Sequence, residues 1–255
     1  MKFMAIADSD IGIVKDTNQD SLLIKHADTQ RGEVLLAIVC DGMGGLTKGE
    51  EASATVIKAF SDWFDTELEY ELENPDMRVI GGKWSLMLKD LNARLLEYGK
   101  QCHTNLGTTF TGMLFIEDNY VIVHVGDTRA YQIGNEITQL TTDQTFVARE
   151  IERGTMTPEQ AKKDKRRNML LQCVGASEKV EPEIITGTAR CGSYMLCSDG
   201  FRHEISAEEI RQAFTDGDYE KAELLTRKNF NGLAHYEEGD ETPFRFGSFT
   251  TMGEI

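Results

Sequence analysis

Four short blocks of Asp and Gly constrain the fold of this chain most, because each one ends or begins an apolar, strand-like stretch. The blocks are Asn18-Gln19-Asp20, Asp41-Gly42-Met43-Gly44-Gly45, Gly126-Asp127 and Ser198-Asp199-Gly200. Carboxylates at strand ends can converge in space while remaining far apart in sequence, and such hard oxygen ligands attract Mg²⁺ or Mn²⁺. One Asp-Gly pair is more often just a turn. Four of them after apolar stretches predict a shared metal site.

The composition indicates one globular domain without a nucleic-acid or membrane partner. With 255 residues, of which 40% are hydrophobic, the chain is long enough to bury a core. Its net charge of −16 would repel nucleic acid and anionic membranes. That charge also suits cation binding, but solubility in the cytoplasm is the simpler explanation of the charge alone, and we favour it. The N-terminus predicts no signal peptide, and no apolar run is long enough to span a membrane, so we expect a cytoplasmic protein.

Cysteine usage excludes two further classes of protein. The five cysteines are odd in number and contain no Cys-x-x-Cys pair, so neither a disulfide framework nor a structural zinc site is expected. Cys40 and Cys197 lie in apolar stretches, where we interpret them as small core residues.

Hydrophobic periodicity predicts two groups of strands separated by a pair of helices, which suggests an α+β fold of two sheets with helices outside them. Strands are predicted at 3–13, 20–26, 33–40, 108–116, 120–125, 130–133 and 194–198, with a weaker one after residue 243. Helices are predicted at about 49–64, 85–100, 206–214 and 219–229. Thr157 and Pro158 form a helix start, with Thr157 as N-cap. The continuous apolar run at 33–40 predicts a strand covered on both faces.

In this order, the motifs resemble those of the metal-dependent Ser/Thr protein phosphatases of type 2C, particularly the small bacterial members. The resemblance covers roughly residues 5–233. The segments that carry it are Asp10-x-Gly12, Asn18-Gln19-Asp20, Asp41-Gly42-Met43-Gly44-Gly45, Gly49-Glu50-x-Ala52-Ser53, Gly107-Thr108-Thr109, Val125-Gly126-Asp127-Thr128-Arg129-x-Tyr131, Leu140-Thr141-x-Asp143, Arg166-Arg167-Asn168 and Cys197-Ser198-Asp199-Gly200. Each is weak alone, but the ordered set is specific. The resemblance implies an α+β fold of two packed antiparallel β-sheets flanked by helices on both sides, in agreement with the pattern of strands and helices.

The resemblance implies hydrolysis of phosphoserine and phosphothreonine in proteins by a metal-activated water, with two Mg²⁺ or Mn²⁺ ions and a possible third. Asp41 would bridge both metals and act in catalysis, while the Gly42 carbonyl would bind one ion and Asp199 the other. Asp127 would help Asp199 to hold a third ion. The implied metal ligands are Asp20, Asp41, Gly42, Asp127, Asp199 and Asp240.

Three positions depart from the family pattern. Lys15 stands where an Arg usually grips the phosphate, and it lacks the planar fork of Arg. Leu46 replaces a His proposed to protonate the leaving alcohol; His203 is a speculative substitute. The closing Asp-Asn pair is absent, so Asp240 is the best match for the last ligand, with Glu238 as a fallback.

Two segments and two other functions stay open. Residues 143–168 match a variable flap, whose basic run Lys162-Lys163-x-Lys165-Arg166-Arg167 is either a solvated helix face or a dock for acidic phosphoprotein segments. The C-terminal segment at about 234–255 is atypical. We expect one catalytic domain over residues 1–255, a monomer, phosphoprotein substrates and an opposing Ser/Thr kinase. The alternatives are a catalytically weak phosphoprotein-binding or regulatory module and an unrelated metallohydrolase.

Overall fold

The computed structural model describes residues 3–9, 17–43, 48–190, 192–204, 208–211, 233–236 and 245–250. The strands in these residues are β1 (Met4–Ser9), β2 (Ser21–Thr29), β3 (Gly32–Cys40), β4 (Phe110–Ile116), β5 (Asn119–Val125), β6 (Arg129–Ile133), β7 (Ile137–Gln139), β8 (Glu183–Thr188), β9 (Gly192–Cys197), β10 (Leu233–Tyr236) and β11 (Arg245–Thr250). The helices are α1 (Gly49–Thr66), α2 (Leu68–Glu73), α3 (Met77–Cys102), α4 (Phe146–Glu152), α5 (Pro158–Ala161) and α6 (Asp199–Glu204).

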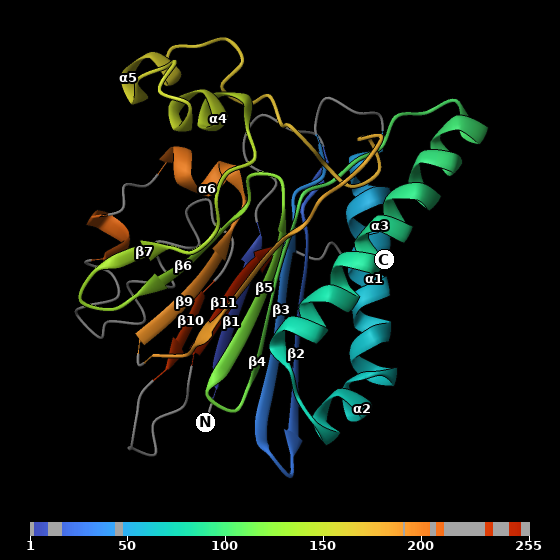
Figure 1. The fold of residues 1–255 in the computed structure, drawn as a ribbon, viewed down its shortest axis with the longest axis vertical. Coiled ribbons are helices and arrows are strands. Elements are labelled where there is room, and N and C mark those ends of the chain that lie inside the picture. The colour runs from blue at the N-terminus through green and yellow to red at the C-terminus, as the bar shows by residue number, and fades with distance from the viewer. Residues whose placement is uncertain are drawn as a thin grey trace.

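The strands form two sheets, which confirms the α+β prediction (Figure 1). One sheet has the order β2-β3-β4-β5-β8, and its neighbouring strands are all antiparallel. The other has the order β1-β11-β10-β9-β6-β7. Its pairings are antiparallel except that β1 runs parallel to β11. The last strand, which the sequence indicates only weakly, is therefore present as β11. It lies between β10 and β1, the first strand of the chain.

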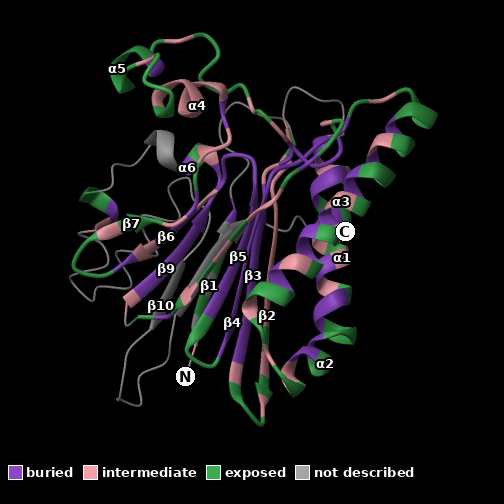
Figure 2. Ribbon diagram, viewed as in Figure 1, coloured by how far each residue is buried: buried purple, intermediate pink, exposed green. Residues whose placement is uncertain are grey.

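Strand β3 is buried along most of its length (Figure 2), and its side chains join apolar clusters on both faces of the sheet. Val34, Leu36, Ile38 and Cys40 join the cluster formed with the helices. Leu35, Ala37 and Val39 join the cluster between the two sheets. The alternation follows from the two-residue period of a strand. A strand buried in this way needs no polar face, which explains the continuous apolar run.

Helices α1 and α3 cover the outer face of the five-stranded sheet (Figure 1). The predicted apolar stripe of α1 is confirmed, because Ala52, Val56, Phe60 and Trp63 are all buried. The Phe60 ring centroid lies 5.1 Å from that of Trp84 on α3. Edge-to-face aromatic pairs of this kind add stability beyond their buried area. The helix pair therefore fixes the sheet that carries two of the Asp-Gly blocks.

Helical residues also pack on the outer face of the six-stranded sheet. Tyr131, Met195 and Cys197 of that sheet form a buried cluster with Phe201 on α6 and with Ile210, which lies in the helical residues 208–211. Within the described residues, helices thus flank both sheets as predicted. No helix among these residues is both long and apolar enough to cross a lipid bilayer.

Several boundaries differ from the sequence prediction. Helix α3 begins at Met77 rather than near residue 85, because the Asp76 carboxylate caps it by accepting from the amides of Arg78 and Val79. Strand β8 was not predicted; it is an edge strand whose residues are only half buried, so its apolar signal is weak. Helix α6 was also missed, because Asp199-Gly200 looks like a turn. The predicted helix at 219–229 lies outside the described residues.

Candidate active site

The first two Asp blocks meet where β2 begins and β3 ends. Ser21 pairs with Cys40, so the next step along the antiparallel ladder brings Asp20 beside Asp41. Burial raises the pKa of the Cys40 thiol well above its usual value, and the negative charges of Asp20 and Asp41 raise it further. Both carboxylates therefore lie close to the same thiol. Cys40 also packs in the apolar cluster between the sheet and the helices, which confirms its interpretation as a small core residue.

The backbone of Asp41 is held by the start of β4. Its amide donates to Thr109 Oγ1 at 2.9 Å, and its carbonyl accepts from the Thr109 amide at 2.9 Å. Thr108 Oγ1 donates to the same carbonyl at 3.0 Å. These bonds explain the two threonines of the Gly107-Thr108-Thr109 motif, because they fix the direction in which the Asp41 side chain leaves the strand.

Gly42 is buried where three chain segments approach closely. Its amide donates to the Gln19 carbonyl at 3.1 Å. A Cβ atom on Gly42 would lie 2.3 Å from the Gln19 oxygen and 2.7 Å from the Gly49 oxygen. Ser53 Oγ donates to the same Gln19 carbonyl at 2.8 Å. The glycines and the serine of the motifs therefore serve close packing of the loop that carries Asp20 and Asp41.

We expect Gly42→Ala to destabilise the protein by about 1–3 kcal/mol, because the new methyl group meets backbone atoms that cannot rotate away. The matched control is Gly82→Ala on α3, where a Cβ would meet nothing within 4 Å. That control should raise stability by about 0.5–1 kcal/mol through helix propensity. Urea unfolding measures both. Equal stability of the two variants would contradict the close packing at Gly42.

The other two Asp blocks leave the six-stranded sheet together. Arg129 at the start of β6 pairs with Cys197 at the end of β9. Asp127 lies two residues before Arg129, and Asp199 lies two residues after Cys197. Because the two strands are antiparallel, both aspartates leave the sheet at the same end. Asp127 is only 5% exposed. Asp199 opens α6, where a negative charge is favourable near the helix N-terminus.

Gly126 lies where the segment that carries Asp127 packs against the segment that holds Asp41. It has a φ of +108°, which favours glycine, and a Cβ there would lie 2.7 Å from Thr109 Cγ2. Because Thr109 also holds Asp41, the Gly126-Asp127 block sits directly beside the Asp41 block. The strand registers thus bring Asp20, Asp41, Asp127 and Asp199 to one end of the two sheets. Among the described residues, no three of these carboxylates have oxygens within 4.8 Å of one another.

The donor set at this end fits a hard divalent cation. Its described members are carboxylates and backbone carbonyls, and oxygen is the ligand that Mg²⁺ and Mn²⁺ prefer. The close packing of the backbone at Gly42 would hold these oxygen atoms in fixed positions around a bound ion. Of the remaining candidates, Lys15, Leu46, Glu238 and Asp240 lie outside the described residues. His203 belongs to α6 by its backbone.

The predicted flap at 143–168 is anchored beside Asp127. The Gly126 amide donates to Gln144 Oε1 at 2.8 Å, and the Gln144 amide donates to the Gly126 carbonyl at 2.7 Å. Asp143 accepts from Nε and Nη2 of Arg129 at 2.7 and 2.6 Å. Within the flap, the predicted cap at Thr157 is confirmed as a capping box with Gln160. The flap therefore rises from the same end of the sheets as the four aspartates.

His124 is a buried residue that the sequence analysis missed. Its Nε2 donates to the Thr142 carbonyl at 3.1 Å, and its Nδ1 accepts from Thr111 Oγ1 at 2.9 Å. Burial lowers its pKa to about 4, although the bond to Thr142 and the charge of Asp143 oppose this. The sequence did indicate its burial: with the two-residue period of a strand, His124 lies on the same face of β5 as Tyr120 and Ile122, which face the other sheet. His124 ties the start of the flap to β5.

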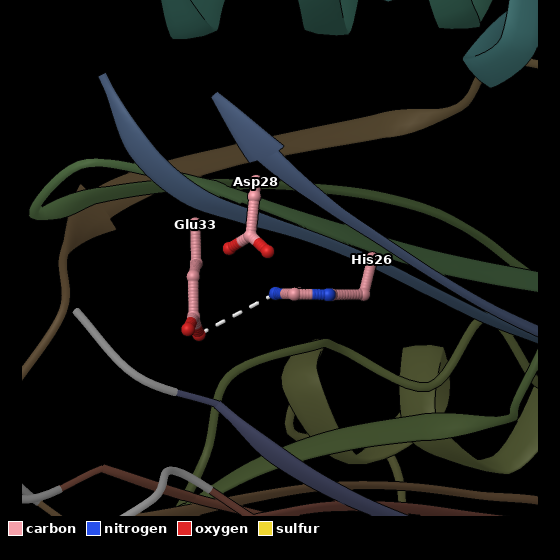
Figure 3. Close-up of side chains that lie close together, drawn as sticks. All are labelled: His26, Asp28 and Glu33. Carbon is pink, nitrogen blue, oxygen red and sulfur yellow. Dashed lines mark ion pairs between the residues drawn. The ribbon is translucent and has the colours of Figure 1, made fainter. Parts of the chain in front are cut away.

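A second group of ionisable side chains lies at the far end of the β2–β3 hairpin (Figure 3). His26 Nε2 lies 3.4 Å from Glu33 Oε2, and Asp28 approaches both side chains. The amide of Phe3 donates to the same Glu33 oxygen at 2.7 Å. These contacts join protein groups to one another and attach the start of β1 to β3. The three side chains lie near the turn of the hairpin, at the opposite end from Asp20 and Asp41.

Comparisons with known proteins agree with this geometry. The family model described as Protein phosphatase 2C matches residues 13–230. The Serine/threonine protein phosphatase PstP of Mycobacterium tuberculosis is 36% identical over 210 residues, which cover 81% of this chain and 38% of PstP. The chain thus spans well under half of that relative's length. Protein phosphatase PhpP of Streptococcus pneumoniae is 29% identical over 233 residues, which cover 88% of this chain and 91% of PhpP.

Solved structures are also similar to this fold. Serine/threonine phosphatase Stp1 from Staphylococcus aureus superposes with a TM-score of 0.74 at 28% identity, covering 91% of this chain and 93% of Stp1. The catalytic domain of PstP in complex with 2 manganese ions gives a TM-score of 0.65 at 30% identity, covering 87% and 90%. The family match extends over most of the chain and includes all four aspartates. This chain belongs to the protein phosphatase 2C family.

Proposed function

We propose that this protein hydrolyses phosphoserine and phosphothreonine in proteins. The observation that carries the proposal is the convergence of Asp20, Asp41, Asp127 and Asp199 at one end of two packed sheets. Family membership supports it, because the relatives are named Ser/Thr phosphatases. The substrates would be phosphoproteins, with an opposing Ser/Thr kinase in the same cytoplasm.

The proposed metal ligands are Asp20, Asp41, the Gly42 carbonyl, Asp127, Asp199 and Asp240. Two Mg²⁺ or Mn²⁺ ions, with a possible third, match this oxygen donor set, and the PstP catalytic domain provides a precedent with two manganese ions. When bound, such ions supply a hydroxide nucleophile at neutral pH and neutralise the phosphoryl oxygens. The protein's own contribution is to hold these ligands rigidly and to position the phosphate.

Several residues of the chain have distinct proposed roles around the phosphate. Thr108 and Thr109 hold the backbone from which the Asp41 carboxylate projects. Lys15 supplies positive charge to the phosphate, without the bidentate geometry of an Arg. Leu46 cannot transfer a proton, so the leaving alcohol must receive its proton from another group or from solvent. We further propose that residues 1–255 act as one monomeric catalytic domain, with a variable flap at about 143–168 and an atypical C-terminal segment at about 234–255.

Hydrolysis of a phosphothreonine peptide with Mn²⁺, against an EDTA control, tests the function. We expect turnover with Mn²⁺ and none with EDTA. Asp240→Ala tests the last ligand in the same assay, and loss of turnover there would support it. Persistent turnover in that variant would point to Glu238. A folded, metal-loaded protein without turnover would contradict the enzyme and favour the phosphoprotein-binding module.

A further inference from the structure

A groove lies between the flap and the six-stranded sheet, and we call it the flap groove. It has a volume of about 630 Å³. Its floor is the segment Thr141–Asp143, and its apolar wall comes from Val147, Ile151, Pro158 and Ala161. The adjoining residue Gln144 is bonded to Gly126, the neighbour of Asp127. The groove therefore lies close to the proposed site of hydrolysis.

The charged residues that line the groove leave an excess of positive charge. Arg129 and Asp143 neutralise each other through their two-bond ion pair. Glu152 is the remaining lining carboxylate, against two remaining cations, Lys162 and Arg167.

More cations surround this rim. Lys163 and Lys165 are exposed beside it. Within the described part of the chain, neither they nor the two lining cations form a direct ion pair, although the charge of Lys162 helps to lower the pKa of the exposed Glu159 carboxyl. Four exposed cations thus gather here, although the whole chain carries a net charge of −16.

The basic segment is held in place by its other residues. Arg166 pairs with Asp164 and lies over the Phe146 ring, with its guanidinium carbon 4.0 Å from the ring centroid. The Phe146 amide donates to the Met169 carbonyl at 2.8 Å. Arg166 is therefore a structural cation, whereas its neighbours are available to a ligand. This distinction separates docking from the alternative of a solvated helix face.

We propose that the flap groove binds an acidic segment of the phosphoprotein substrate next to the phosphorylated residue. The inference rests on the proposed phosphatase function and adds a substrate class to it. An acidic protein repels acidic ligands at long range. A local cluster of cations beside the site offsets that repulsion and favours phosphosites with Asp or Glu neighbours. The apolar wall accommodates the aliphatic parts of such a segment.

The test compares two phosphothreonine peptides that differ only by Glu→Gln changes flanking the phosphothreonine. At low salt, we expect the wild-type kcat/KM to be roughly 10-fold higher for the acidic peptide, mainly through KM, since each exposed ion pair contributes modestly. The double variant Lys162→Glu/Arg167→Glu should lose this preference, because its kcat/KM should fall much more for the acidic peptide than for the neutral one, whose phosphate alone meets the new carboxylates. The control, Lys58→Glu/Lys179→Glu, changes the net charge equally at exposed positions elsewhere and should keep the preference. Added salt should weaken the wild-type preference.

The outcomes separate this inference from the proposed function. Fluorescence anisotropy of the labelled acidic peptide measures binding without turnover, with Mn²⁺ present. If the wild type turns over neither peptide but binds the acidic one through Lys162 and Arg167, the groove is supported and the enzyme is not. Equal kcat/KM and equal binding for the two peptides would overturn the inference. A preference that survives in the double variant, or disappears equally in the control, would overturn it too.

Discussion

We expect Asp41→Ala and Asp199→Ala each to lower Mn²⁺-dependent hydrolysis by at least about 1,000-fold while the protein remains folded. The magnitude follows because metal ions supply several kcal/mol of transition-state stabilisation, and each 1.4 kcal/mol is tenfold in rate. Folding should survive, because the bonds that hold this region at Asp41 come from its backbone to Thr108 and Thr109 and remain in the variant.

Three measurements make this result specific. Turnover of a phosphothreonine peptide gives the rate, and circular dichroism confirms the fold. The rise in melting temperature on adding Mn²⁺ reports metal binding directly, because a ligand that binds only the folded state stabilises it. Asp62→Ala, at an exposed position on α1, is the control and should behave like the wild type in all three. Retained turnover in Asp41→Ala would remove that residue from the metal centre.

The second large effect is a loss of stability in mild acid that depends on His124. Its pKa in the folded protein is about 4, against an ordinary value of 6.5. The unfolded chain therefore binds a proton that the folded protein excludes at pH values between these two. Stability from this group is complete above about pH 6.5 and is lost as the pH falls towards 4, by about 3 kcal/mol in total.

Urea unfolding in EDTA at pH 7.5 and pH 5.0 measures this loss, which should reach about 2 kcal/mol at pH 5.0 for the wild type. In His124→Gln, the part of the stability loss that is due to His124 should vanish. The stability of this variant should therefore fall less than that of the wild type between pH 7.5 and pH 5.0. Should that variant fail to fold, an NMR titration of the wild-type imidazole decides the matter. A His124 that titrates near 6.5 would contradict the burial argument.

The residues of β3 and of the helix caps were predictable because their signals are local. The apolar run at 33–40 implies cover on both faces whatever the neighbours are, and β3 has such cover. Thr157-Pro158 predicts a helix start from the hydrogen-bonding needs of one turn, and α5 begins there. The weak edge strand β8 could not be predicted in this way, because its stability comes from pairing with β5 rather than from its own composition.

The sequence by itself predicted which residues would bind metal, because carboxylates and backbone carbonyls suit Mg²⁺ or Mn²⁺ and each Asp lies in a short local motif. It also determined the two-sheet class through hydrophobic periodicity. The tertiary structure alone decided that Asp20 faces Asp41, that Gly126 packs on Thr109, and that the cations of the flap border a groove beside Asp127. The reason is physical: strand register, close approach and charge neutralisation arise between segments that are distant in the sequence, and no local pattern encodes them.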